Sequence, residues 1–358
     1  MSFRFSLGSL LALACVSGGH PAAAAPYYEG KTITLIVGLS PGGSTDVFVR
    51  SFAEVLERHI PGHPEIVVQN MPGNGGVKAA NYVFEVAKPD GLRLYWGNWS
   101  PIGQIIGDEN LHAKYDQFEF IGAVDDTRLV YARTDTIPGG LKKPADIVRA
   151  DDPNLGGIAP TTTPDILVRL SLDLLGVRYN YVPGYGGGSE IYAAMLGKEL
   201  QISTTSLVSY RGRSADFVQS GEGTALYYLV PTDADGKFTP NPYITGMPAF
   251  PDLYREIHGK APAGPDWEAL NWLVRLAGQI TIVGLAPPGT DPAALADLRT
   301  GYEAAAKDVA FSEQATKALG HPYTFVMPEE GEAIIRSLVD TPPSVTSAIK
   351  KLLEGFKQ

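Results

Sequence analysis

The stretch Leu39-Ser40-Pro41-Gly42-Gly43-Ser44-Thr45-Asp46 decides the predicted fold, because it joins an apolar run to an amphipathic one through small, turn-forming residues. Residues 32–37 are β-branched or apolar and suit a buried strand, and apolar side chains recur at helical spacing over 45–59. Ser44, Thr45 or Asp46 can cap this helix. The two glycines leave N–H groups unshielded at the helix start, where the dipole favours a carboxylate or phosphate. The stretch predicts either a binding loop or a plain turn.

The alternation of strand and helix continues after this first unit. The turn Asn70-Met71-Pro72-Gly73-Asn74-Gly75-Gly76 separates a strand at 66–69 from a second helix, and Pro89-Asp90-Gly91 precedes a strand at 92–96. Strands separated by helices of this length form right-handed parallel βαβ units. Ligands of such sheets lie beyond the carboxyl ends of the strands, so Asn98 and Trp99 become candidates.

A second α/β set begins near residue 129. Its expected elements are strands at 129–132, 155–159 and 179–182 and helices at 143–149, 166–175 and 190–196. Residues 231–266 are rich in Pro, Gly and Asp, and this composition predicts a long surface excursion. The last expected elements are a strand at 279–285 and helices at 292–307, 329–339 and 345–356.

The first 25 residues have the pattern of a secretory signal. Arg4 is followed by a short apolar run and by the small residues Ala22 to Ala25, so we expect cleavage near Ala24 or Ala25 and export to the periplasm. Cys15, the single cysteine of the sequence, lies inside this segment, so the mature chain has no thiol. Lipidation of Cys15 is disfavoured because Ala12 stands where a branched apolar residue is needed. No later stretch is long enough to cross a membrane.

The mature chain is strongly acidic. Without Arg4 it carries 28 basic and 39 acidic residues, a net charge of −11. This balance argues against nucleic acid as a partner. An anionic ligand has to be held by local features, such as helix N-termini and backbone donors, against the overall field.

Motifs for catalysis and cofactor binding are missing from the sequence. The Pro41–Asp46 loop is neither a phosphate-binding loop with a Gly-Lys-Ser/Thr end nor the dinucleotide motif, so no nucleotide cofactor is expected. The histidines lack zinc spacing, and no Gly-x-Ser-x-Gly elbow occurs. The pairs Asp125-Asp126 and Asp151-Asp152 are interpreted as solvated loops. We therefore expect a protein that is not an enzyme, without metal or cofactor.

Arginines and aromatic residues offer further candidates that the sequence leaves open. Three arginines can pair with ligand carboxylates or act as surface or salt-bridging residues; they are Arg128, Arg169 and Arg211. Four aromatic residues beside the proposed loops can line a cleft or pack in a core; they are Trp96, Trp99, Tyr181 and Tyr185.

The order of these pieces resembles a known family, the Bug-type solute receptors of tripartite tricarboxylate transporters. The resemblance rests on the signal, the strand before Pro41–Asp46, the turn 70–76 and Pro89-Asp90-Gly91, and is strong over residues 31–131. It continues more thinly through Tyr181–Gly188, the following Met195-Leu196-Gly197-Lys198, and Ala286–Thr290.

The resemblance implies a type II, two-lobed periplasmic binding protein of the Venus-flytrap kind, with a mostly parallel sheet flanked by helices in each lobe. It implies a first lobe of residues 26–127, a second lobe of 128–235 and a return to the first lobe over 236–358. In that family the turn at 41–46 and a facing turn at 157–163 hold one carboxylate through backbone groups and water, and the loop at 183–188 contributes. Together with the candidates after the third strand, the predicted ligand-binding residues are Ser40, Pro41, Gly42, Gly43, Ser44, Thr45, Asp46, Asn98, Trp99, Gly157, Thr161, Thr162, Thr163, Gly184, Tyr185 and Gly186.

The chain departs from the family at two places. The turn Gly157–Asp165 contains Pro160 and Pro164 where the family has a glycine- and serine-rich turn followed by His-Leu, and prolines remove backbone donors. Threonine hydroxyls can take their place there. The excursion at 231–266 is also longer than the family's segment.

The expected function is capture of a small organic anion, a mono-, di- or tricarboxylate that can be aromatic, by a monomer that delivers it to the permease subunits of a tripartite transporter. The alternatives are a secreted hydrolase that uses the same cleft and a receptor that signals through a partner.

Overall fold

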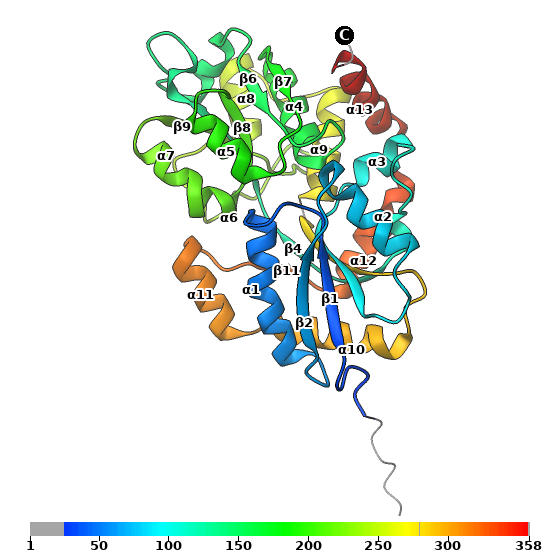
Figure 1. The fold of residues 1–358 in the computed structure, drawn as a ribbon. Coiled ribbons are helices and arrows are strands. Elements are labelled where there is room, and N and C mark those ends of the chain that lie inside the picture. Colours follow the sequence, from blue (N-terminus) through cyan, green and yellow to red (C-terminus); the bar gives the residue numbers. More distant parts are fainter. Residues whose placement is uncertain (1–24, 279, 357–358) are drawn as a thin grey trace, which may run out of the picture.

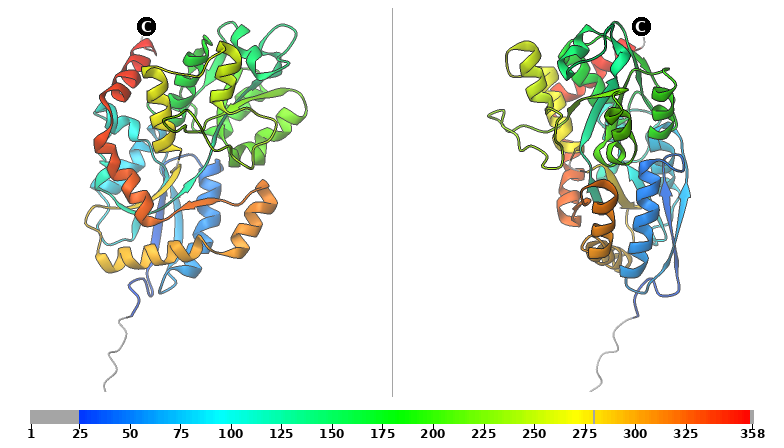
Figure 2. Two further views of the ribbon diagram at one scale, coloured as in Figure 1. Left: turned by 180° about the vertical axis from the view of Figure 1, so that it is seen from behind. Right: turned by 90° about the vertical axis from the view of Figure 1, so that its left-hand side faces the viewer.

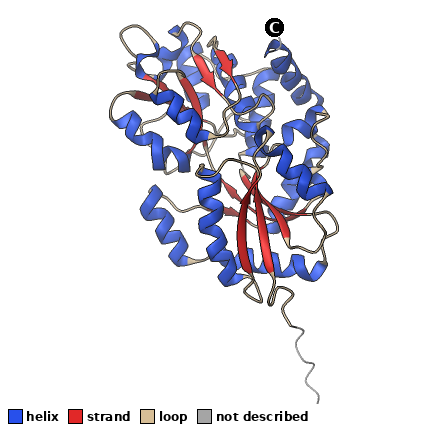
Figure 3. Ribbon diagram, in the orientation of Figure 1, coloured by secondary structure: helices blue, strands red, loops and turns tan. Residues whose placement is uncertain are grey.

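The computed structural model describes residues 25–278 and 280–356, which form two α/β lobes, one above the other in Figure 1. The predicted signal peptide, apart from Ala25, and Gln279 of an expected strand lie outside the described residues. Each lobe has one sheet with helices on its faces, as Figure 3 shows. No helix of the described residues is long and apolar enough to cross a membrane.

The first lobe contains a six-stranded sheet in the order β11-β4-β10-β3-β1-β2. Its strands are β1 (Thr32–Val37), β2 (Glu65–Asn70), β3 (Arg93–Asn98), β4 (Glu119–Asp125), β10 (Ile282–Ala286) and β11 (Thr324–Val326). β1 pairs in parallel with β2 and β3, whereas β10 and β11 are antiparallel to their neighbours. The antiparallel strands are those that the chain adds after it returns from the second lobe.

The second lobe contains a five-stranded sheet in the order β7-β6-β8-β5-β9. Its strands are β5 (Arg128–Arg133), β6 (Asn154–Gly156), β7 (Asn180–Val182), β8 (Ile202–Ser206) and β9 (Gly223–Tyr228). β5 is antiparallel to β8 and β9, and β6 is parallel to β7 and β8. The two-lobed α/β architecture is confirmed, with mixed sheets where the sequence predicted mostly parallel ones.

Helices cover both faces of each sheet (Figure 2). The first lobe uses α1 (Ser44–His59), α2 (Val77–Glu85), α3 (Pro101–Ile106), α10 (Pro292–Ala305), α11 (Val309–Leu319) and α12 (Pro328–Arg336). The second uses α4 (Thr163–Leu175), α5 (Gly188–Leu196), α6 (Leu207–Ser209), α7 (Ala215–Gln219), a π-helical turn η5 (Tyr210–Ser214) and a short 3₁₀ helix η4 (Pro144–Arg149). Phe52 and Trp96 lie in the core beneath α1, and Leu170 and Leu172 in the core beneath α4. Burial of such side chains is the main stabilising term of each lobe.

The return segment is shared between the lobes. α8 (Phe250–His258), α9 (Pro265–Ala277) and α13 (Pro343–Phe356) pack with α4, so their apolar faces complete the core of the second lobe. β10, α10, α11, β11 and α12 belong to the first lobe. The expected first-lobe segment 236–358 is thus divided, because α9 and α13 pack against α4 and share its apolar core. The expected surface excursion also contains a whole helix, α8.

Candidate functional site

The first predicted loop joins β1 to α1 and ends at the boundary between the lobes. Gly42 has a positive φ of 78°, and its N–H donates to Asp46 Oδ2 at 2.8 Å. The Asp46 carboxylate also accepts from Arg50 Nε and Asn70 Nδ2. Burial opposes the ionisation of Asp46, but these hydrogen bonds from Arg50, Gly42 and Asn70 hold its pKa below the ordinary value. Asp46 therefore shapes the turn from inside and leaves the helix start to a ligand.

The start of α1 is the part of this loop that faces the other lobe. Gly43 is the cap residue and has no side chain to occupy the first N–H groups. Thr45 donates its hydroxyl to Asn98 Oδ1 at 2.5 Å, which fixes the end of β3 against the helix start. Ser44, Thr45 and Asn98 together line a small cavity between the lobes.

Trp99 lies away from this cavity, in the core of the first lobe. It is buried and packs edge-on against Tyr115, with ring centroids 5.9 Å apart. Trp99 is thus a core residue, one of the two alternatives that the sequence left open. The neighbouring Ser100 makes the contact with the second lobe instead, because its hydroxyl donates to the carbonyl of Thr161 at 3.0 Å.

The second predicted loop, residues 157–163, uses its backbone donors for a carboxylate of its own chain. The N–H groups of Ile158 and Ala159 donate to Asp165 Oδ2 at 2.7 and 2.9 Å, and the Tyr181 hydroxyl donates to the same atom. Gly157 leaves room for the Tyr181 ring, since a Cβ there would lie 2.3 Å from it, and its N–H donates to the carbonyl of Val182. The sequence predicted that backbone N–H groups of this turn bind a ligand, but in the structure the N–H groups of Ile158 and Ala159 already bind Asp165.

Two of the three threonines of this loop lie at contacts between the lobes. Thr162 is buried, and its Cγ2 lies 2.4 Å from where a Cβ on Gly75 would be. Gly75 has a φ of 62°, so a side chain is disfavoured there on conformational grounds as well. Thr163 begins α4 and is also buried. Thr161 and Thr162 thus contribute to the fit of one lobe on the other, whereas Thr163 is a buried helix residue of the second lobe.

The third predicted loop also has an internal carboxylate. The N–H of Gly186 donates to Glu190 Oε2 at 2.8 Å. Tyr185 donates its hydroxyl to Glu199 at 2.6 Å, and burial together with that bond raises the pKa of Tyr185 to about 12. Gly184 has a φ of 110°, which the turn requires. This loop meets the first lobe through Ser189, whose hydroxyl donates to the carbonyl of Gly42 at 3.4 Å.

The interlobe cavity is lined from both lobes and is smaller than the predicted ligands. Its volume is about 20 Å³, enough for a single water molecule. Besides Ser44, Thr45 and Asn98, its lining residues include Asp126, Arg128, Ser206, Thr281 and Tyr323. The lobes contact one another beside this cavity, which in this conformation has no room for a carboxylate of the predicted size.

Asp126 and Arg128 are the charged groups that the sequence analysis did not combine. They lie in the chain segment that crosses from β4 to β5, and Asp126 is 9% exposed. Burial raises the pKa of Asp126 against the hydrogen bond from Ser206 and the positive charge of Arg128. The interpretation of Asp125-Asp126 as a solvated loop is wrong, because β4 carries the pair into the boundary between the lobes. The apolar run of residues 120–124 before the pair is typical of a buried strand and could have predicted β4.

The other two candidate arginines form hydrogen bonds within the chain. Arg169 is buried in the second lobe and donates to the carbonyl of Leu352 in α13 at 2.9 Å. Arg211 donates to the carbonyl of Tyr243 at 2.6 Å. Arg128 is therefore the one of the three that lines the interlobe cavity.

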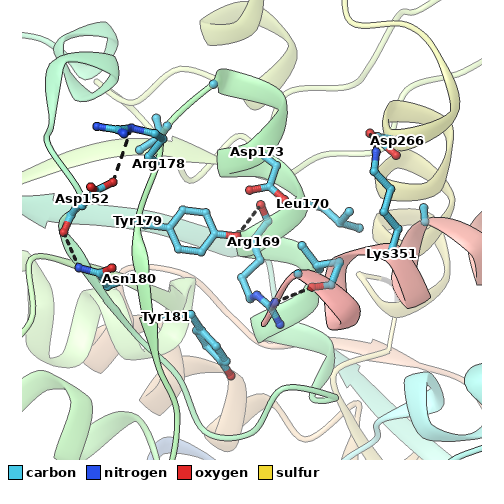
Figure 4. A pocket seen from close by; sticks show the side chains of 15 residues that line it. Asp152, Arg169, Leu170, Asp173, Arg178, Tyr179, Asn180, Tyr181, Asp266 and Lys351 are labelled. Atoms are coloured by element: carbon cyan, nitrogen blue, oxygen red, sulfur yellow. Dashed lines mark hydrogen bonds and ion pairs between the residues drawn. The ribbon is translucent and has the colours of Figure 1, made fainter. Parts of the chain in front are cut away.

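A larger hollow than the interlobe cavity lies elsewhere, on the second lobe between β7, α4, α9 and α13 (Figure 4). It has a volume of about 700 Å³ and is open to solvent. Its charges are paired within the chain, for example Arg178 with Asp151 at 2.8 Å and Lys351 with Asp266 at 3.3 Å. These pairs leave little for a ligand to satisfy, so the interlobe boundary is the better candidate site. No cluster of metal-ligating side chains occurs among the described residues.

Comparisons with known proteins concern the sequence and the fold of the whole chain. No protein-family model matches the chain. A UPF0065 protein of Bordetella pertussis is 26% identical over 318 residues, which cover 86% of this chain and 87% of that protein. The periplasmic binding protein BugD has a TM-score of 0.64 at 20% identity, covering 92% of this chain and 98% of BugD. MatC from Rhodopseudomonas palustris, solved with bound malate, has a TM-score of 0.65 at 19% identity, covering 90% of this chain and 99% of MatC.

The sequence match spans both lobes, and the structural matches reproduce the whole two-lobed fold. The predicted resemblance is thereby confirmed: in sequence and in fold this chain is similar to the Bug-type periplasmic solute-binding receptors.

Proposed function

We propose that the protein is an exported, periplasmic solute-binding protein that captures a small organic carboxylate between its lobes and delivers it to the permease subunits of a tripartite tricarboxylate-type transporter. The observation that carries the proposal is the start of α1, whose cap Gly43 has no side chain and which shares a cavity with Arg128 of the other lobe. A helix N-terminus and a guanidinium that converge on one space favour an anion. The malate bound by MatC, a protein of similar fold, supports this chemistry.

In this proposal the ligand favours closure of the lobes because it contacts groups from both lobes only when they are closed. An anion bound at α1 in the open state neutralises the helix start, and Arg128 is added only when the second lobe closes. Closure also forms the contacts from Ser100 to Thr161 and from Ser189 to Gly42. A ligand shifts the equilibrium only by its differential affinity for the two states, and the charge of Arg128 supplies that difference.

The protein acts in this proposal by binding alone, as a monomer and without covalent chemistry. The proteins that it resembles are binding proteins. The residues that we propose to contact the ligand are Ser44, Thr45 and Asn98 from the first lobe and Arg128 and Ser206 from the second. The three predicted loops keep their place at the boundary and hold these residues in position.

A thermal-shift screen of carboxylates, aromatic acids, amino acids and sugars tests the ligand class. We expect acids to raise the melting temperature by the amount that mass action gives for a ligand bound only to the folded state. If sugars or neutral amides raise it and no acid does, the carboxylate proposal is wrong.

The variant Gly43→Val tests the site. Gly43 has a φ of −72°, and a Cβ there would meet nothing closer than 3.6 Å, so the fold accepts valine. The branched side chain covers the N–H groups of α1, and we expect at least a tenfold loss of affinity for the acid that the screen selects. Gly212→Val, on the exposed η5 turn, is the matched control and should bind normally. Undiminished affinity in Gly43→Val would remove α1 from the site.

A further inference from the structure

A second cavity adjoins the interlobe cavity at the crossing between the lobes. This hinge cavity has a volume of about 420 Å³, within the range of small-molecule sites. Asp125, Thr127 and Arg128 form one wall, and the excursion residues 239–243 form another. Apolar and aromatic side chains complete its lining, among them Leu167, Tyr228, Val230, Tyr243 and Val274.

Asp125 is the unusual group in this lining. Its Oδ1 is buried and has no hydrogen-bond partner among the described residues. Burial and the neighbouring charge of Asp126 raise the pKa of Asp125 to about 7, against one backbone hydrogen bond from Asp126. A buried carboxylate oxygen without a hydrogen-bond partner is costly, and such atoms are uncommon in folded proteins.

Arg128 connects the hinge cavity to the interlobe cavity, because its side chain lines both. Asp126 and Asp165 are the charges that act on Arg128, while Asp125 faces the hinge cavity without a positive partner of its own. A purely anionic ligand in this place leaves Asp125 unbalanced. A ligand with both an anionic and a cationic group places its negative charge at Arg128 in the interlobe cavity and its positive charge at Asp125 in the hinge cavity.

The cavity wall formed by the excursion residues 239–243 is fixed by contacts with both lobes. Asn241 Nδ2 donates to Thr127 Oγ1 at 2.9 Å, and Arg211 donates to the carbonyl of Tyr243. The Tyr243 ring packs on His321 of the first lobe, with centroids 5.4 Å apart. The excursion thus places an aromatic ring and prolines beside a carboxylate, which suits a cation attached to an apolar body.

We propose that the ligand of the interlobe site is an amphoteric acid with an apolar body, whose carboxylate lies at Arg128 and α1 and whose ammonium group and apolar part occupy the hinge cavity beside Asp125. The proposal rests on the proposed function, since it assigns the ligand class of the same site. An apolar or aromatic amino acid has this combination of groups and a suitable size.

Three matched compounds test the proposal with the mature protein by isothermal titration calorimetry. L-phenylalanine carries both charges, 3-phenylpropionate lacks the ammonium group, and 2-phenylethylamine lacks the carboxylate. We expect phenylalanine to bind at least tenfold more tightly than either of the others at pH 8. Equal or tighter binding of 3-phenylpropionate would overturn the proposal.

The variant Asp125→Asn separates the role of the carboxylate from shape. It should lower the affinity for phenylalanine at least tenfold and leave that for 3-phenylpropionate equal or improved. Asp235→Asn, exposed on the same excursion, is the control and should change neither. Unchanged binding of phenylalanine in Asp125→Asn refutes the proposal. If malate binds and phenylalanine does not, the ligand class is wrong while the proposed function stands; if no acid binds at all, the proposed function fails first.

Discussion

Asp125 is expected to destabilise the folded protein at neutral and alkaline pH, and Asp125→Asn is expected to relieve this. The folded-state pKa is about 7, whereas the ordinary value is 3.8. A difference of about three pKa units corresponds to about 4 kcal/mol, and the partial exposure of the residue reduces this to about 2–4 kcal/mol. The folded state binds more protons than the unfolded state between pH 4 and 7, so wild-type stability falls as the pH rises through that window and then levels off.

Urea unfolding of wild type and Asp125→Asn at pH 4, 6 and 8, without added ligand, measures the effect. At pH 4 both side chains are uncharged and the two proteins should unfold at similar urea concentrations. At pH 8 the variant should be more stable by about 2–4 kcal/mol. A stability difference that is the same at all three pH values refutes the reasoning, because it would show that Asp125 ionises without penalty. Asp235→Asn, exposed to solvent, should follow wild type throughout.

Two further predictions concern closure and stability. Gly75→Ala places a Cβ 2.4 Å from Thr162 Cγ2 at a φ of 62°, so we expect incomplete closure, seen as about a tenfold loss of affinity in calorimetry and a larger radius of gyration in X-ray scattering with ligand. Adding Thr162→Ser removes the clashing methyl group and should restore part of the affinity. If the affinity is not restored, the backbone conformation of residue 75 alone causes the loss. Asp308 caps α11 and bonds His59, and the hydrogen bonds from His59 and the Phe311 N–H lower the pKa of Asp308 to about 2. Asp308→Ala should therefore lose about 1 kcal/mol at pH 7, a loss that fades as the pH falls from 4 to 2; urea unfolding that shows the same loss at pH 2 contradicts this.

The first lobe was the more predictable half of the fold. The unit from β1 to β3 follows local signals, and the predicted start of α1 at residue 45 is within one residue of Ser44. β4, β8 and β9 were not predicted, because their register depends on strands from distant parts of the chain. α8 was hidden in a segment rich in Pro and Gly, where its strongly one-sided apolar face has only nine residues.

The loops of the candidate site were predictable, but the use of their donors was not. Sequence spacing located the turns at Gly42 and Gly186, and each is followed four residues later by a carboxylate that accepts the glycine N–H. This spacing is visible in the sequence, although only the backbone geometry shows that the bond forms. Arg128 and Asp126 remained apart from the site because β4, which brings them to the boundary, was not recognised.

The carboxylates of Asp46, Asp165 and Glu190 have a consequence for competition among anions at the proposed site. Each already satisfies N–H groups of a loop that would otherwise attract any anion. Phosphate, sulfate and chloride are therefore expected to bind only at the N-terminus of α1. To bind at the other loops, they would have to displace a carboxylate of the chain itself. These built-in acids confine the proposed anion site to the N-terminus of α1, so inorganic ions and the proposed organic ligand would compete at that one place.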